Sequence, residues 1–194
     1  MSASYGNTEK RQHIVETAYA LFKREGFHAT GIDRIIAEAG VAKMTLYRHF
    51  PSKDGLTVEV LAWRARRFDH QLDQLAELDA TPEQKILTIF DCYGRWFQSP
   101  DFHGCLFAHA LAEFGDPTHP VFKAVADQKH GLKTRMRRIL EAALPEDQAE
   151  SIASALLMLL EGATLLAQMG QGETAIRDAR NAALGLLAKL PARQ

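Results

Sequence analysis

The sequence predicts an all-α protein, and two observations lead to this fold class. Apolar residues recur every three or four positions along most of the 194 residues, and no stretch shows the strict alternation of a half-buried strand. Glycine and proline interrupt the pattern at intervals that suit helices. An apolar content of 46% is enough to fill a core in a chain of this length.

The first four expected helices end at glycine or proline signals. Gly26 ends the first as a left-handed cap, and Phe27 can then fold back onto its apolar stripe. Gly40 ends the second helix, and Pro51 ends the third, which leaves Ser52 to cap the fourth. The expected ranges are 8–25, 32–39, 42–49 and about 53–78.

Five further helices are expected after residue 80. Thr81, Pro82 and Gln84 open the fifth with a capping box that has proline at the first helical position. Proline or glycine separates the remaining helices, and Gly170 ends the eighth. The expected ranges are 82–99, 103–114, 120–143, 145–169 and 173–190.

Charge is distributed unevenly, although the formal net charge is only −1. Residues 1–70 carry eleven Lys and Arg against eight Asp and Glu, whereas residues 71–194 carry twelve against sixteen. A basic first third suits a surface that meets a polyanion. Chance in a chain of this size is the alternative explanation.

Composition also indicates the compartment. The sequence has no run of eighteen apolar residues, and its first dozen residues are polar, so we expect no membrane segment and no secretory signal. Two cysteines are too few for a disulfide framework and fit a reduced compartment. We therefore expect a cytoplasmic protein without a membrane partner and without a cofactor.

Two short helices joined by a tight turn have the spacing of a helix-turn-helix. The helix at 42–49 is too short to be stable alone, and a helical projection points Leu46 and Phe50 inward. Its opposite face is polar and basic. Such a face suits DNA, because Lys and Arg can bond guanine edges while Tyr, His and Lys donate to phosphates. A solvated surface with ordinary cations is the alternative.

Residues 11–56 resemble the DNA-binding domain of the TetR family of transcriptional repressors. The matching segments are ETAYALFKREGFHATGIDRIIAEAG and GVAKMTLYRHFPSKDGL. The resemblance implies a nine-helix architecture, with a helix-turn-helix domain at 1–53 and a helical ligand-binding and dimerisation domain at 54–194. The resemblance and the helical projection together predict a DNA-facing set: Thr30, Lys43, Met44, Thr45, Tyr47, Arg48, His49 and Lys53.

Four positions depart from the family pattern. Ala42 stands where serine or threonine often caps the third helix, which removes a bond worth about 1 kcal/mol. Met44 stands in place of a frequent glycine, and Gly31 in place of a usual serine or threonine. Asp33 occupies a position that is basic in some members. These departures concern the operator sequence and not operator binding itself.

The helix expected at 145–169 is apolar on nearly every side, so it needs a partner besides its own core. The helix at 173–190 repeats the pattern more weakly. We expect a homodimer built as a four-helix bundle, although a buried core helix of a monomer would look similar. The predicted interface residues are Ile152, Leu156, Leu157, Leu160, Ile176, Ala179, Ala183 and Leu187. Two recognition helices would then meet successive major grooves, about 34–36 Å apart.

Large apolar side chains with a few polar ones occur throughout residues 90–161. Mostly apolar walls with few polar groups describe a small-molecule pocket, and plain core packing is the alternative. The family resemblance implies an effector in this region, which we expect to be largely apolar. The predicted pocket residues are Phe90, Tyr93, Trp96, Phe97, Phe107, His109, Phe122, Met136, Met158 and Glu161.

Catalytic and metal chemistry are not expected. Cys105, His109 and Glu113 are spaced four residues apart, but one helix supplies at most two convergent ligands, so no metal site is predicted. The sequence has no P-loop, dinucleotide fingerprint, G-x-S-x-G or H-E-x-x-H motif, which argues against an enzyme. The predicted function is a ligand-responsive repressor that binds a palindromic operator as a dimer. A regulator without an effector and an activator are the alternatives.

Overall fold

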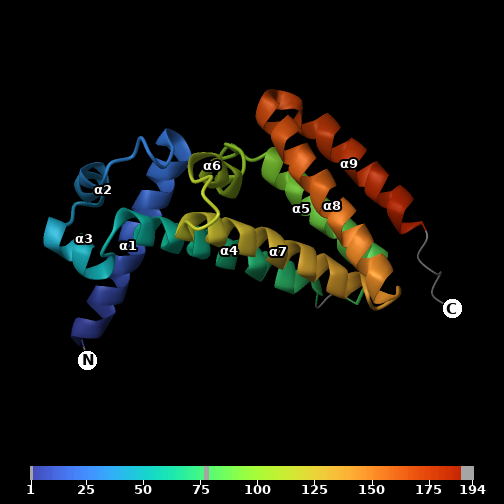
Figure 1. Cartoon of the computed structure of the whole chain (residues 1–194), viewed down its shortest axis with the longest axis horizontal. Helices are drawn as coiled ribbons and strands as arrows, with labels where there is room; N and C mark the ends of the chain where they lie inside the picture. The colour runs from blue at the N-terminus through green and yellow to red at the C-terminus, as the bar shows by residue number, and fades with distance from the viewer. Residues whose placement is uncertain (1, 77–78, 189–194) are drawn as a thin grey trace. The chain divides into compact units, whose positions relative to one another are not determined.

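A computed structural model describes residues 2–76 and 79–188 of the chain. Over these residues all regular structure is helical, with nine α-helices and one π-helical turn, so the predicted all-α class and nine-helix architecture are confirmed (Figure 1). The helices are α1 (Ser2–Glu25), α2 (Ile32–Ala39), α3 (Lys43–His49), α4 (Lys53–Ala76), α5 (Pro82–Phe97), α6 (Leu106–Glu113), α7 (Pro120–Leu140), α8 (Glu146–Leu166) and α9 (Gly172–Leu187), with the π-helical turn Ala167–Gln171 before α9.

The local signals at helix ends act as predicted. Gly26 and Gly40 both have left-handed backbone angles, with φ of 86° and 60°, directly after α1 and α2. The Thr81 hydroxyl accepts the Gln84 N–H at 3.2 Å, and the Gln84 side chain accepts the Thr81 N–H at 2.9 Å. This capping box fixes the start of α5.

Some helix ends differ from the predicted ones. α6 begins three residues later than expected, because Gly104 has a left-handed φ of 86° that an α-helix does not contain. α7 ends at Leu140 instead of 143, because a turn leads from there to Pro145, and the residue before proline avoids the helical region. α1 starts earlier than predicted. The ends predicted at 78 and 190 lie outside the described residues.

The chain divides into two compact units, which are described separately. Unit 1 comprises residues 1–67 and 105–126, and unit 2 comprises residues 68–104 and 127–194. Unit 1 therefore contains α6 as well as α1, α2 and α3, although α6 follows α5 in the sequence. The functional boundary predicted at residue 53 stays a prediction, since compactness does not define a functional domain.

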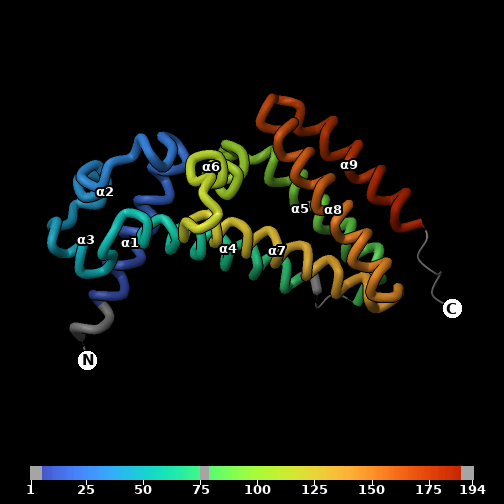
Figure 2. The backbone as a smooth tube through the Cα atoms, viewed as in Figure 1, coloured from blue at the N-terminus to red at the C-terminus, as the bar shows by residue number. Residues whose placement is uncertain are grey.

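In unit 1, α1 packs against α2 and α3, and the trace in Figure 2 lets the reader follow this part of the chain. The apolar stripe predicted on α1 is buried, and Phe27 folds back as expected, with its ring centroid 4.8 Å from that of Phe22. The fully or almost fully buried side chains of this core are Ile14, Ala18, Leu21, Phe22, Phe27, Ile35, Leu46, Phe50, Leu56 and Val60.

In unit 2, α8 packs along α9, and α5 packs against both. Many of the buried residues of α8 and α9 are small, and small side chains allow helix backbones to approach closely. These buried alanines are Ala149, Ala153, Ala163, Ala175, Ala179 and Ala183. Larger core side chains, among them Ile86, Phe90 and Met136, fill the space beside them.

The helical stretch Glu146–Leu187 is unusually apolar. By length and composition alone it is a candidate membrane span, with a mean hydropathy of 1.6 over eighteen residues, although core helices of soluble proteins meet the same criteria. Only 33% of that window is buried within the chain. Considerable apolar surface therefore stays exposed along this stretch.

Candidate nucleic-acid interface

Two apolar side chains hold α3 in unit 1. Leu46 is fully buried, and Phe50, which follows the helix, is only 3% exposed. The Arg11 guanidinium lies 5.0 Å from the centroid of the Phe50 ring and donates to Glu59 of α4 at 2.8 Å. Burying such apolar side chains contributes about 1.5–3 kcal/mol each, which supports a helix of seven residues that would be unstable alone. The inward orientation predicted for Leu46 and Phe50 is confirmed.

The turn between α2 and α3 is tight. The Gly40 N–H donates to the carbonyl of Ala37, and the Val41 N–H donates to the carbonyl of Ile36, both at 3.3 Å. Ala42 is the extended N-cap residue of α3 and makes no side-chain capping bond. Three residues thus separate the helices, which is the geometry of a helix-turn-helix.

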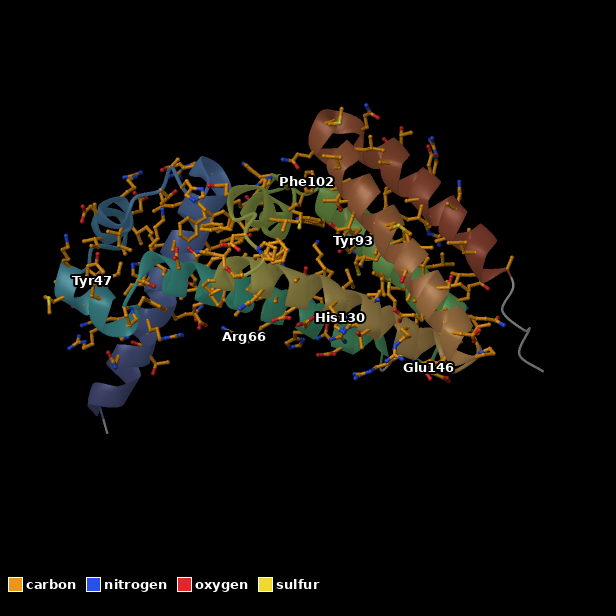
Figure 3. The ribbon with its side chains drawn as sticks, viewed as in Figure 1. Tyr47, Arg66, Tyr93, Phe102, His130 and Glu146 are labelled. Carbon is orange, nitrogen blue, oxygen red and sulfur yellow. The ribbon has the colours of Figure 1, made fainter. Side chains whose placement is uncertain are left out.

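Apart from Leu46, no residue of α3 is buried, so the side of the helix that points away from Leu46 is free, and Lys43 at the helix start is exposed as well. Lys43 and Arg48 are exposed, Met44 is 79% exposed, and Thr45 and Tyr47 are half-buried (Tyr47 is labelled in Figure 3). Cations and hydroxyl groups can bond phosphates and base edges, and an apolar side chain can contact a thymine methyl group. The structure brings these five predicted residues together on one short helix, and their contact with DNA stays a prediction.

Lys43 has an acidic neighbour on α2. Its Nζ lies 3.4 Å from an Asp33 carboxylate oxygen, and both side chains are largely exposed. Exposed ion pairs of this kind contribute between nothing and about 1 kcal/mol. Asp33 therefore orients Lys43 without preventing it from moving to another partner.

Thr30 does not lie on this face. Its side chain is 0% exposed, and its hydroxyl donates to the Gly26 carbonyl oxygen at 2.7 Å. Since a buried hydroxyl that is already bonded cannot reach a phosphate, the predicted contact through this side chain is wrong. Thr30 instead ties the loop between α1 and α2 to the end of α1.

His49 is half-buried at the end of α3. Its Nε2 is inaccessible and has no hydrogen-bond partner among the described residues. Burial lowers the pKa of the imidazole below 6.5, and the positive charges of Arg48, Arg11 and Lys10 lower it further. The ring is therefore neutral at neutral pH, so the predicted phosphate contact of His49 would depend on the other ring nitrogen.

Lys53 is the first residue of α4 and lies close to the loop between α1 and α2. Its Nζ is 3.5 Å from the His28 carbonyl oxygen. The Ser52 hydroxyl accepts the Gly55 N–H at 3.0 Å, as expected for a helix cap. The predicted phosphate contact of Lys53 would thus be made from a helix start whose own N–H groups also favour an anion.

The predicted dimer residues need correction. Five of the eight are buried in the core of unit 2 within one chain: Leu156, Leu160, Ala179, Ala183 and Leu187. Ile152, Leu157 and Ile176 are half-buried. A different face of α8 is free, and it carries Ser151, Ala155, Met158, Gly162 and Leu165.

The predicted pocket residues are distributed over both units, and their role in effector binding stays a prediction. Phe90 and Met136 are fully buried core residues, so the packing alternative holds for them. Met158 is 68% exposed, which excludes it from an internal pocket within the chain. Phe107, His109 and Phe122 belong to unit 1, and Glu161 accepts a hydrogen bond from Lys129 at 2.7 Å.

Three predicted pocket residues do come together in unit 2. Tyr93, Trp96 and Phe97 form an aromatic cluster with Phe68 of α4 and Phe102, and neighbouring ring centroids are 4.9–6.0 Å apart. Tyr93 and Phe102 are labelled in Figure 3. The sequence did not indicate Phe68 and Phe102, since neither shares the apolar stripe of α5.

Unit 2 also has a cavity of about 1310 Å³ that none of the predicted pocket residues lines. Its walls combine apolar side chains with charged and polar ones, and the latter include Asp69, Asp73, His130, Arg135 and Arg138. Arg135 is engaged by Asp73 and, at 3.6 Å, by Asp69. This cavity differs in chemistry from the apolar pocket predicted from the sequence.

Metal-binding geometry is not found among residues 2–76 and 79–188, where no group of three His, Cys, Asp or Glu converges. Cys105 precedes α6 as its N-cap residue and is buried. Glu113, at the other end of α6, accepts hydrogen bonds from backbone N–H groups of Phe27 and His28. Cys105 and Glu113 therefore lie at opposite ends of α6, and Glu113 is bonded to the loop between α1 and α2.

Two family profiles match most of the chain. Residues 14–60 match the profile described as bacterial regulatory proteins of the tetR family. Residues 82–183, more than half of the chain, match the profile described as a tetracyclin repressor-like C-terminal domain.

Individual proteins are similar over almost the whole length. The crystal structure of a TetR-family transcriptional regulator from Streptomyces coelicolor has a TM-score of 0.87 and 29% identity, covering 94% of this chain and 96% of that one. The HTH-type transcriptional regulator YxaF of Bacillus subtilis is 25% identical over 171 residues, which is 86% of this chain and 88% of that protein. The HTH-type transcriptional repressor KstR of Mycobacterium tuberculosis is 35% identical over 83 residues, 43% of this chain and 38% of that protein.

The lowered pKa of His49 predicts how acid affects stability. In the unfolded chain the imidazole binds a proton near pH 6.5, whereas the folded protein binds it only at lower pH. The free energy of unfolding of the wild type relative to His49→Gln should therefore be constant above about pH 6.5 and should fall as the pH drops through the folded pKa. Urea unfolding between pH 5 and 8 measures this difference, and a difference that grows on acidification would contradict it.

Proposed function

Because the chain belongs to the TetR family of transcriptional regulators, we propose that it is a repressor that binds a palindromic operator as a homodimer and leaves it when a small molecule binds. As a member of this family it is a DNA-binding transcriptional regulator and not an enzyme. The observation that carries the proposal is the free face of α3, which Leu46 and Phe50 hold away from the core.

Operator binding is assigned to that face and to the start of α4. Lys43 and Arg48 supply exposed positive charge, and Met44 supplies an exposed apolar surface. Lys53 adds a cation beside the first N–H groups of α4. Repression as the sign of regulation is supported by the similarity to KstR, which is described as a repressor. Cytoplasmic localisation is part of this proposal, since the operator is cellular DNA.

The dimer contact is assigned to the free face of α8. Ser151, Ala155, Met158, Gly162 and Leu165 are spaced by four, three, four and three residues, which is the heptad period of helices that pack side by side. Met158 is 68% and Leu165 is 62% exposed in the single chain. Uncharged small and apolar residues at this period suit a two-fold contact in which α8 meets its counterpart.

Effector binding is assigned to the aromatic cluster of unit 2. The half-buried rings of Trp96, Phe97 and Phe102 offer a largely apolar surface, with Tyr93 beside them. Such a surface suits an apolar molecule. The charged cavity of about 1310 Å³ is the second candidate site, and it would suit a polar effector. Release of DNA requires that the effector bind the DNA-free state more tightly than the DNA-bound state.

The operator proposal is tested with DNA that the purified protein selects from a random duplex pool. We expect a palindromic selected sequence, and we expect Tyr47→Ala combined with Lys53→Ala to weaken its binding at least about 100-fold, because two contacts to phosphate are lost. Fluorescence anisotropy at several salt concentrations measures this. Lys53→Ala alone should lower the salt slope by about 0.9.

Lys123→Ala is the matched control for these changes, since Lys123 is an exposed lysine of unit 1 on α7. It should leave affinity and salt slope unchanged. Retention of selected-DNA binding by the Tyr47 and Lys53 double variant would refute the assignment of the DNA-binding face.

The dimer proposal is tested by adding charge to the free face of α8. Met158→Glu with Leu165→Glu should convert the protein to a folded monomer, because four carboxylates would face one another across the two-fold axis. Sedimentation equilibrium measures the mass, and operator affinity should fall with it. Leu111→Glu, at an apolar side chain of unit 1 that is 43% exposed, should leave the dimer intact. A dimeric double variant would rule out this face.

The effector proposal is tested with Trp63→Phe, which leaves Trp96 as the only tryptophan. A compound that releases the operator should raise the Tm by about 5–10 °C at roughly 100 times its Kd, and should change the Trp96 emission. A releasing compound that leaves Trp96 emission unchanged and loses its effect in Arg138→Ala would place the site in the charged cavity instead.

A further inference from the structure

Glu113, the last residue of α6, is bonded to the loop between α1 and α2. Its Oε1 accepts the Phe27 N–H at 2.9 Å, and its Oε2 accepts the His28 N–H at 2.6 Å. The same Oε2 lies 2.9 Å from Nδ1 of the His28 ring. One carboxylate thus holds two consecutive backbone amides that lie 86 and 85 positions away in the sequence.

The loop is shaped for this contact. Gly26 has a left-handed φ of 86°, and a Cβ at this position would lie 3.2 Å from Glu113 Oε1. The Gly26 N–H still donates to the Phe22 carbonyl of α1, whereas the N–H groups of Phe27 and His28 donate to Glu113. Burial alone would raise the pKa of Glu113, but the N–H groups of Phe27 and His28 and the His28 ring outweigh it, so the pKa lies below its ordinary value. The group that holds the loop is therefore an ionised carboxylate at neutral pH.

The same loop residue contacts the predicted DNA-binding surface. While the His28 N–H is bonded to Glu113, the His28 carbonyl oxygen lies 3.5 Å from Nζ of Lys53. His28 is therefore connected to α6 through its N–H and to Lys53, the first residue of α4, through its carbonyl oxygen. Displacing the carboxylate would release the loop and with it the acceptor that holds Lys53.

A second contact joins the end of α6 to the start of α4. Phe114, next to Glu113, lies between two imidazole rings, with centroids 4.7 Å from His28 and 4.9 Å from His119. His119 in turn lies 3.3 Å from the carboxylate of Asp54, the residue after Lys53. Both the loop and the start of α4 are thus held by the segment that follows Glu113.

All of these residues belong to unit 1, but they come from different parts of the family pattern. Phe27, His28 and Lys53 lie within the N-terminal match, whereas Glu113 and Phe114 lie within the C-terminal match. α6 is therefore a part of the C-terminal region that is bonded directly to the loop between α1 and α2.

We propose that Glu113 is a positioning residue for operator binding, which acts through the His28 peptide to fix the place of the Lys53 ammonium group. The proposal rests on the proposed function, because it requires that Lys53 contact DNA. A purely structural Glu113 would change stability without any specific effect on Lys53.

The test is a double-variant cycle of Glu113→Gln and Lys53→Ala, measured on selected operator DNA between 50 and 200 mM salt. Glutamine keeps the shape but has no charge, and its NH₂ group faces one of the two N–H donors. We expect Glu113→Gln to weaken binding about tenfold and to lower the salt slope toward that of Lys53→Ala. Because both changes act through one ammonium group, the double variant should be no weaker than Lys53→Ala within about twofold.

Asp116→Asn is the matched control, since Asp116 is a carboxylate of the same segment that accepts from Thr118 and does not contact the loop. It should leave the salt slope unchanged. If Glu113→Gln does not fold, as judged by its urea transition, Glu113→Asp replaces it in the cycle. The shorter carboxylate reaches at most one of the two amides, so its effect should be smaller but equally dependent on Lys53.

The outcomes separate the two proposals. Two results would overturn the positioning role while the DNA-binding function stands. One is a Glu113 variant with wild-type operator affinity and salt slope. The other is a double variant whose fold-loss of affinity equals the product of the fold-losses of the two single variants. A wild type that selects no DNA, or a Lys53→Ala protein with an unchanged salt slope, overturns the proposed contact itself and the positioning role with it.

Discussion

The burial of Leu46 and Phe50 is the interaction on which the geometry of α3 and its exposed residues depends. α3 has seven residues, too few to be helical alone, so these two side chains supply much of the stabilisation that keeps it folded. They also fix the rotation of α3 about its own axis, because burying one face of a helix determines which residues lie on the opposite face. The exposure of Lys43, Met44 and Arg48 follows from that constraint.

The loop between α1 and α2 sets where α2 and the start of α4 lie. Three sets of bonds stabilise it. The Thr30 hydroxyl donates to the Gly26 carbonyl, and the Phe27 and His28 N–H groups donate to Glu113. The Lys53 ammonium group lies within hydrogen-bond distance of the His28 carbonyl. A loop without regular structure needs such external partners for its polar backbone groups. The bonds of Glu113 explain why α6 belongs to unit 1 although it follows α5 in the sequence.

α8 has two faces of different character. Alanines on one face let it pack closely on α9, while Met158, Gly162 and Leu165 leave another face uncharged and open. An exposed apolar face of this length is costly in water unless a partner covers it. The high hydropathy of the stretch therefore fits a helix with a core on one side and a second chain on the other.

The sequence by itself determined the features that a few neighbouring residues encode: the helical class, the capping box at Thr81, the left-handed ends at Gly26 and Gly40, and the inward pair Leu46 and Phe50. Only the tertiary structure decided which face of α8 is internal, since apolar residues on every side give periodicity no unique answer. It likewise decided the burial of Thr30 and the partners of Glu113. Bonds between residues more than eighty positions apart leave no periodic trace in the sequence, because the fold alone brings such residues together.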